Sequence, residues 1–221
     1  MSASGEVLDE ADIDGNIYAV LALQGKRIVF NAGLNKMHKV NASGHTSTLA
    51  LFPARLVDAP PFLGLPPGTK ISMDSVPTTV TLGPDSAIYV GELTGFPFLP
   101  GEARIYRIPH GHNPADPPPV YLVGFSHIID IAFDEDGNLY VLEMAAETLL
   151  DVFSGANLST GDLVRVGTDG SREILVSGLT TPSGIALDPD GGSIYISNCG
   201  VCVGSGEVLR LNLDDDDSSD D

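Results

Sequence analysis

The chain has 221 residues, of which 43% are hydrophobic, and its formal net charge is −19 at pH 7. This length allows one sizeable core, and 25 Gly with 16 Pro fit a protein made of short strands and turns. So acidic a chain repels phosphate backbones, which argues against nucleic acid as a partner. The longest apolar run, residues 17–23, is far below the roughly 20 residues that cross a bilayer, so no membrane insertion is expected.

The two ends of the chain carry little structural signal. The opening MSASGEVLDE lacks the basic and apolar segments of a secretory signal, so a complete chain is expected in the cytoplasm. Its first fifteen residues read like the end of a preceding repeat, which leaves room for a longer parent with its own targeting signal. The run DDDDSSDD, residues 214–221, predicts a disordered acidic tail.

Four segments share one pattern: an apolar run, a turn and a second apolar run that ends in a polar residue. They are AVLALQGKRIVFN (19–31), VPTTVTLGPDSAIYVGE (76–92), IIDIAFDEDGNLYVLE (128–143) and TPSGIALDPDGGSIYISN (181–198). Their spacing of about fifty residues is typical of propeller blades rather than of helical repeats.

Each copy continues with further short apolar runs. A third run follows in every copy, and a fourth follows in the first three copies, at 46–51, 120–123 and 173–176. Four short strands per unit predict antiparallel blades, so the fold class is all-β, a β-propeller. One domain, 1–213, is expected to hold all the blades. Their predicted bounds are 16–53, 76–125, 128–178 and 181–213.

The polar residues that end the second runs are the first site candidates. Asn31, Glu92, Glu143 and Asn198 hold equivalent places, so a propeller sets them around one rim as candidate ligand-binding residues. Oxygen atoms that converge from several blades suit Ca²⁺, with Glu92 and Glu143 as the candidate metal ligands. The alternative is that these side chains cap strand ends and hold the loops behind them.

Two further motifs carry chemistry. His127 and Asp130 lie at the start of an innermost strand and could form an acid/base pair, although a structural histidine is the alternative. Cys199 and Cys202 supply only two thiolates, too few for a structural zinc site, and they follow a strand rather than opening a helix. A disulfide in an oxidising compartment or two free thiols elsewhere remain open.

Three segments resemble the ScyD/ScyE family, NHL-like β-propellers of the scytonemin biosynthesis cluster of cyanobacteria. They are SVPTTVTLGPDSAIYVGELTGFPFLPGEARIYRI (75–108), GFSHIIDIAFDEDGNLYVLE (124–143) and GLTTPSGIALDPDGGSIYISNCGVCVGSGEVLRL (178–211). The resemblance covers about residues 14–213 and implies a secreted or periplasmic protein with a six-bladed ring, of which about four blades are present. It implies no established activity. The first blade departs from the family pattern at Asn31, where an acid is common.

Gluconolactonase-type propellers hold a divalent metal with Asn and Asp near the starts of innermost strands. Here Thr78, Thr79 and Ser183 occupy such places beside Asp130, so a closely similar lactonase site is not expected.

Two functions are therefore predicted. The first is a non-catalytic or accessory binding scaffold that presents loops 92–103, 143–162 and 198–206 to a small molecule or protein, in secondary metabolism or outside the cell. The alternative is a metal-dependent lyase or hydrolase with a site in the central channel, where a cation lowers the pKa of its bound water.

Ring closure gives the last expectation. Residues 3–9 could add an outer strand to the last blade and close a four-bladed ring, or the chain could form an open arc. Neighbouring blades packed for a six-bladed ring would have to adapt to the larger angle between blades of a four-bladed ring. Densely packed interiors resist such a change, which favours an open arc of a six-bladed ring. An arc exposes apolar faces at its two ends, so self-association is expected.

Overall fold

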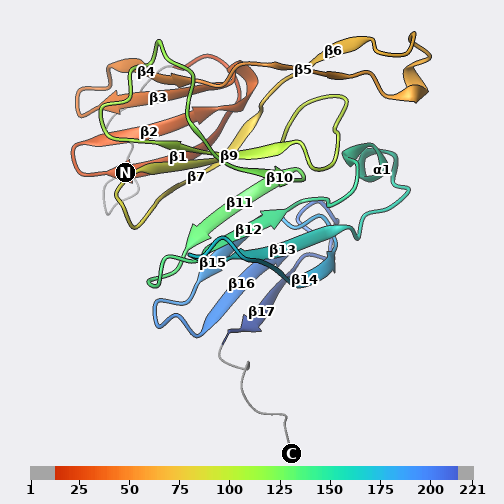
Figure 1. The fold of residues 1–221 in the computed structure, drawn as a ribbon. Helices are drawn as coiled ribbons and strands as arrows, with labels where there is room; N and C mark the ends of the chain where they lie inside the picture. Colours follow the sequence, from red (N-terminus) through yellow and green to blue (C-terminus); the bar gives the residue numbers. More distant parts are fainter. Residues whose placement is uncertain (1–12, 214–221) are drawn as a thin grey trace, which may run out of the picture.

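The computed structural model describes residues 13–213, and almost all of its regular structure is antiparallel sheet (Figure 1). Blades 1 and 2 each contain four strands that pair in chain order. Blade 1 consists of β1 (Ile17–Leu23), β2 (Lys26–Asn31), β3 (Lys36–Asn41) and β4 (Thr46–Leu51). Blade 2 consists of β7 (Pro77–Leu82), β8 (Ile88–Glu92), β9 (Ala103–Ile108) and β10 (Val120–Phe125).

Blades 3 and 4 repeat this order, and blade 4 has three strands within the described range. Blade 3 consists of β11 (Ile128–Phe133), β12 (Leu139–Glu143), β13 (Gly161–Val166) and β14 (Arg172–Leu179). Blade 4 consists of β15 (Gly184–Leu187), β16 (Ser193–Asn198) and β17 (Glu207–Asn212). The prediction of an all-β propeller built from such blades is confirmed.

The turns between the first two strands follow from their sequences. In blade 3 the Asp134 carboxylate accepts a hydrogen bond from the Asn138 backbone N–H at 2.7 Å, and Gly137 takes a φ of 88°. A residue with a Cβ is strained at such a φ, so glycine suits this place. The tight turn sets β11 against β12 in register, with Ile128 opposite Glu143.

Three apolar clusters hold neighbouring blades together. One contains Phe30 from blade 1 and Ile108 from blade 2, a second contains Ile105 and Ile128, and a third contains Leu142 and Ile196. Each cluster lies between two neighbouring blades, so blades 2 and 3 bury both of their faces and blades 1 and 4 bury one face each. The innermost strands β1, β7, β11 and β15 consequently lie side by side in chain order.

The described blades form an open arc. Among residues 13–213, the innermost strands contact one another in the order β1, β7, β11 and β15, and blade 4 shows no comparable packing against blade 1. Ile17, Tyr18 and Val20 of β1 are exposed. Residues 3–9, the predicted closing strand, and the tail 214–221 lie outside the described residues.

A hairpin between blades 1 and 2 was not predicted. It consists of β5 (Arg55–Asp58), the short 3-10 helix η2 (Pro61–Leu63) at its tip, and β6 (Lys70–Met73), and it projects from the body at the upper right of Figure 1. The other short helices are η1 (Ala32–Leu34) and α1 (Leu149–Ser154). In the described range, no helix has the length and apolar character needed to cross a membrane.

Candidate functional site

We name as the loop face the end of the molecule where second strands finish and innermost strands begin. It carries three loops, 93–102, 144–160 and 199–206, together with the short segments that precede the innermost strands. All four rim residues predicted from the repeat lie here, as does His127.

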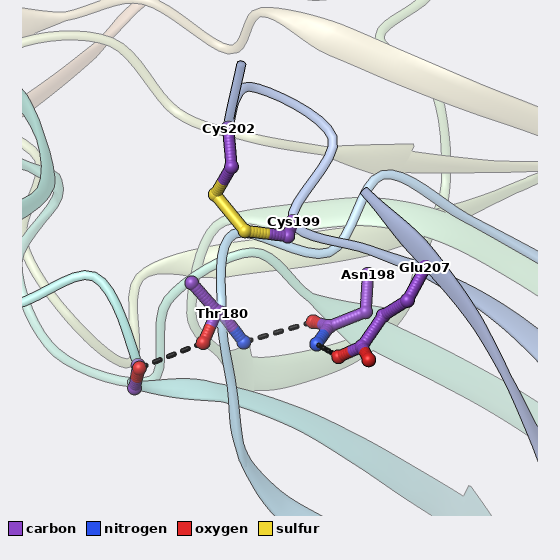
Figure 2. The surroundings of a disulfide bond; sticks show 6 residues. Thr180, Asn198, Cys199, Cys202 and Glu207 are labelled. Carbon is purple, nitrogen blue, oxygen red and sulfur yellow. Dashed lines mark hydrogen bonds between the residues drawn. A yellow bond between two sulfur atoms is a disulfide. The ribbon is translucent and has the colours of Figure 1, made fainter. Parts of the chain in front are cut away.

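Asn31 and Asn198 use their side chains to hold backbone. Asn198 Oδ1 accepts a hydrogen bond from the Thr180 backbone N–H at 2.9 Å, and its Nδ2 donates to Glu207 Oε1 at 2.8 Å (Figure 2). Asn31 Nδ2 donates to the Asp14 carbonyl at 2.6 Å. Both amides therefore use their oxygen and their nitrogen to hold neighbouring residues in place.

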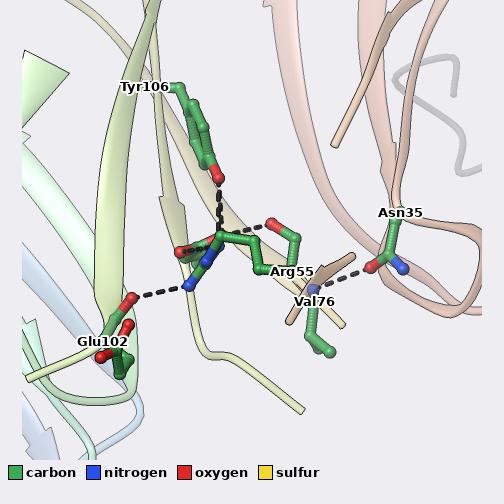
Figure 3. A network of polar contacts seen from close by, with 7 residues as sticks. Asn35, Arg55, Val76, Glu102 and Tyr106 are labelled. Carbon is green, nitrogen blue, oxygen red and sulfur yellow. Dashed lines mark hydrogen bonds and ion pairs between the residues drawn. The ribbon is translucent and has the colours of Figure 1, made fainter. Parts of the chain in front are cut away.

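Glu92 is fully buried and paired with a cation from the hairpin. The Arg55 guanidinium lies 2.7 Å from Oε1 and 2.9 Å from Oε2. It also donates to the Glu102 carbonyl at 2.7 Å (Figure 3). The hydroxyls of Ser75 and Tyr106 donate to the same carboxylate. Arg55 thus fills the place that a metal ion would take beside Glu92.

The pKa values in this cluster reflect its burial. Burial raises the pKa of Glu92, while Arg55 and the two hydroxyls oppose this rise. Burial and the charge of Glu92 together raise the pKa of Tyr106 to about 12. Tyr106 therefore remains a hydrogen-bond donor at neutral pH, and the cluster ties the hairpin to blade 2.

Glu143 differs from Glu92 because no cation pairs with it in the described part of the chain. Its Oε1 accepts a hydrogen bond from the Ser126 backbone N–H at 2.6 Å, and Asp162 lies directly opposite on β13. Burial, reinforced by the charge of Asp162, raises the pKa of Glu143 to about 7. This carboxyl can therefore hold or release a proton near neutral pH.

These contacts share one geometry. Asn31, Glu92 and Glu143 each bond 17 residues back along the chain, and Asn198 bonds 18 residues back. Each side chain therefore joins the end of a second strand to the segment before its own innermost strand, which agrees with the capping alternative. Across residues 13–213, no three His, Cys, Asp or Glu side chains gather in a way suited to a metal ion.

His127 and Asp130 face different partners. His127 Nδ1 lies 2.9 Å from the Ala145 carbonyl, while the Asp130 carboxylate accepts from Thr79 Oγ1 at 2.8 Å and the Ile185 N–H at 2.9 Å. Asp130 thus joins blades 2, 3 and 4. Burial lowers the pKa of His127 and raises that of Asp130. No hydrogen bond joins the two residues in the described structure, so it does not assemble the predicted acid/base pair.

Backbone strain gathers at the start of the innermost strands. Gly15, Val76, His127 and Thr181 lie one to three residues before these strands, and all have a positive φ, of 118°, 51°, 44° and 40°. His127 Nε2 and Thr181 Oγ1 are also buried without a hydrogen-bond partner among the described residues. Positive φ at residues with a Cβ, together with unpaired polar atoms, is typical of functional rims.

A row of four phenylalanines crosses the loop face, and the repeat pattern did not predict it. Phe62 of η2 contacts Phe96, Phe96 contacts Phe98, and Phe98 contacts Phe153 of α1, with ring centroids 6.4, 6.1 and 5.3 Å apart. Phe62, Phe96 and Phe153 remain 61%, 44% and 66% exposed. The only sequence signal was the unusual GELTGFPF segment, which contains Phe96 and Phe98.

Cys199 and Cys202 form a disulfide at the start of loop 199–206 (Figure 2). The Cys199 backbone N–H donates to the Thr180 carbonyl at 2.7 Å, and the Cys202 N–H donates to the Cys199 carbonyl at 3.0 Å. The bond therefore fixes a tight turn directly after β16, beside the Asn198 contact.

No protein-family model matches the chain, and no curated protein matches it significantly. Several solved structures resemble the chain in fold. One is a protein described as a gluconolactonase, with 14% sequence identity and a TM-score of 0.54. Two others are described as an oxidoreductase (glucose dehydrogenase) from Thermus thermophilus, with 18% identity and a TM-score of 0.56, and as a 6-phosphogluconolactonase from Bacteroides uniformis, with 16% identity and a TM-score of 0.54. The matches cover 89%, 90% and 90% of this chain but 62%, 62% and 54% of those chains. The chain is thus a partial β-propeller spanning less than two thirds of these neighbours.

Proposed function

We propose that this chain is a binding propeller whose loop face holds an apolar small molecule or the apolar side chains of a protein partner. The row Phe62, Phe96, Phe98 and Phe153 carries the proposal. Its rings come from three separate segments and contact one another by their edges, and Phe62, Phe96 and Phe153 remain exposed. Exposed contiguous apolar side chains on a soluble protein mark interaction surfaces, and aromatic rings dominate the energies of such surfaces.

The polar contacts of the rim support binding rather than catalysis. Glu92 is paired with Arg55, Asn198 bonds to Thr180 and Glu207, and Asp130 bonds to neighbouring strands. These bonds make the loop bases rigid, and a rigid base lowers the entropic cost of ordering the loops when a partner binds. The resemblance to ScyD/ScyE proteins and the disulfide both favour a secreted or periplasmic location, since disulfides persist in oxidising compartments.

Exchange of two phenylalanines tests the proposal. Phe96→Ala with Phe153→Ala removes two exposed rings, and Val123→Ala on the outer strand β10 removes apolar surface away from the row as a matched control. In a screen of aromatic fragments and candidate proteins, we expect saturable binding that the double variant weakens by about tenfold or more while the control does not. If the double variant bound as tightly as the unchanged chain, the binding site would lie elsewhere.

A second candidate is an enzyme that uses Glu143 as a general acid or base. One observation favours it: this buried rim carboxyl has a pKa of about 7, which suits proton transfer at neutral pH. The neighbours assigned as lactonases suggest a sugar lactone as the first substrate to try. Turnover of gluconolactone with added Ca²⁺ or Zn²⁺, lost in Glu143→Gln, would favour this candidate over the binding scaffold.

A further inference from the structure

A groove of about 380 Å³ lies between blades 3 and 4, at the end of the molecule opposite the loop face. The turn between β11 and β12 forms one wall, and Gly191 with the residues at the end of β17 forms the other. Tyr140, Arg165 and Glu173 of blade 3 also line it. A smaller groove of about 240 Å³ shares Arg165 and Glu173, so this guanidinium borders both hollows.

The third strand of blades 2, 3 and 4 carries an arginine at the same place, and the three arginines have different partners. Arg107 Nε donates to Asp85 at 2.6 Å in blade 2, and Arg210 Nε donates to Ser193 Oγ at 3.0 Å in blade 4. Arg165 Nε is buried without a hydrogen-bond partner among the described residues. Within the same range, Arg165 joins no ion pair.

The sequence of the blade 3 turn explains this difference. Asp134 already accepts from the Asn138 N–H at 2.7 Å and from the Asn138 side chain at 2.8 Å, and the Tyr140 hydroxyl donates to it at 3.3 Å. Blade 2 has Gly83 at the place of Asp134 and Ala87 at the place of Asn138, so no asparagine side chain competes there, and Asp85 binds Arg107 in addition to the Ala87 N–H and the Tyr89 hydroxyl. In blade 3 the equivalent of Asp85 is Asp136, which is exposed and lines the groove.

We propose that this groove binds a small zwitterion, an α-amino acid with an apolar side chain, whose carboxylate pairs with Arg165. The planar guanidinium matches a carboxylate in shape and charge, so two parallel hydrogen bonds can form between them. Glu173 lies directly opposite Arg165 on β14, and Asp136 lines the same groove, so both are placed to receive the ammonium group. Leu175 and Leu211 supply an apolar wall.

Charge complementarity selects the zwitterion over simpler ions. A plain carboxylate would meet Arg165 but also the negative charges of Asp134, Asp136 and Glu173, and a plain amine would meet the three acids but also Arg165. A ligand with both groups pairs each charge with its opposite, which discriminates against ligands with only one. This site is separate from the loop face, so the proposal goes beyond the function proposed above.

Three related probes test the site on the full 221-residue chain: leucine, its methyl ester, which lacks the carboxylate, and 4-methylpentanoate, which lacks the ammonium. Amide chemical shifts followed during titration report both affinity and location. We expect leucine to shift the amides around Arg165 and Glu173 saturably, and each of the other two probes to bind about tenfold more weakly or worse.

Variants make the assignment specific. Arg165→Lys keeps the charge but loses the planar fork, and we expect it to weaken leucine binding by about tenfold. Arg107→Lys at the equivalent place in blade 2 is the matched control and should leave binding unchanged. Glu173→Gln should also weaken leucine binding, and thermal melting confirms that each variant is folded.

Four results would overturn the proposal: no saturable shifts around the groove, equal binding of 4-methylpentanoate and leucine, unchanged affinity in Arg165→Lys, or tighter binding in Glu173→Gln. The last result would show that Glu173 occupies Arg165 in solution rather than receiving the ammonium group.

Discussion

Glu92 and Glu143 occupy the same position of the repeat in blades 2 and 3, but different charged groups lie beside them. Arg55 reaches Glu92 from the hairpin, 37 positions away in the sequence, and no corresponding hairpin lies between blades 2 and 3. Glu143 instead faces Asp162 and keeps a pKa of about 7. One repeat position therefore supports an ion pair in blade 2 and a titrating carboxyl in blade 3.

Replacement of Arg55 should be costly for stability. Arg55→Ala leaves the buried Glu92 carboxylate without its cation, and breaking such a buried pair costs about 3–5 kcal/mol of unfolding free energy. Urea unfolding followed by circular dichroism measures the loss. Arg107→Ala, which breaks the surface pair with Asp85, is the control and should cost much less because solvent screens that pair. Similar losses in both variants would contradict a structural role specific to Arg55.

Glu143 should make stability depend on pH. Its folded pKa, about 7, lies above its ordinary value of 4.5, so the folded state binds the proton more tightly than the unfolded chain. The contribution to stability is complete below pH 4.5 and is lost as pH rises to about 7, with a change on the order of 3 kcal/mol. Glu143→Gln should remove this part of the slope between pH 5 and 8. An unchanged slope in urea unfolding would contradict the raised pKa.

At the scale of single elements, the sequence predicted the strands better than the insertions. The strands repeat a pattern of apolar runs and turns, so four copies reinforce one another, and the rim residues could be aligned from the sequence. The hairpin from Arg55 to Met73 occurs once and has no such support. The contact of Phe98 with Phe153 joins loop 93–102 to α1, and no local pattern encodes a contact between distant segments.

The Arg165 guanidinium shows the same limit at a different element. Its place on the third strand was visible from the sequence, but its lack of a partner among residues 13–213 depends on how Asn138 and Tyr140 use the Asp134 carboxylate. Which side chains form hydrogen bonds with one another depends on three-dimensional geometry rather than on residue type alone. The sequence positions of His127 and Asp130 likewise did not predict their hydrogen-bond partners.

The disulfide should stabilise its own loop more than the whole fold. It closes only the short segment from Cys199 to Cys202, and chain-entropy estimates for so small a loop give about 2 kcal/mol. Cys199→Ser with Cys202→Ser should therefore lower the unfolding free energy by about that amount or less, while hydrogen exchange in loop 199–206 increases. Loss of all cooperative folding in the double variant would contradict this local role.

For the whole molecule, the open arc predicts association. Ile17, Tyr18 and Val20 are exposed on β1 at one end of the arc, and Val208 is exposed on β17 at the other. Apolar patches of this kind favour contact between copies. Light scattering on the purified 221-residue chain should therefore show self-association or poor solubility. A monodisperse monomer with a sharp cooperative melt would contradict the expectation.

The most direct test of the binding function is to locate a ligand on the molecule. Amide shift mapping with an aromatic fragment selected by screening measures this for every assigned backbone position at once. We expect saturable shifts in loop 93–102, helix α1 and the tip of the β5–β6 hairpin, and their loss when Phe96 and Phe153 are replaced by alanine. Saturable binding elsewhere with an unperturbed loop face, or turnover that depends on Glu143 without any binding at the phenylalanine row, would contradict it.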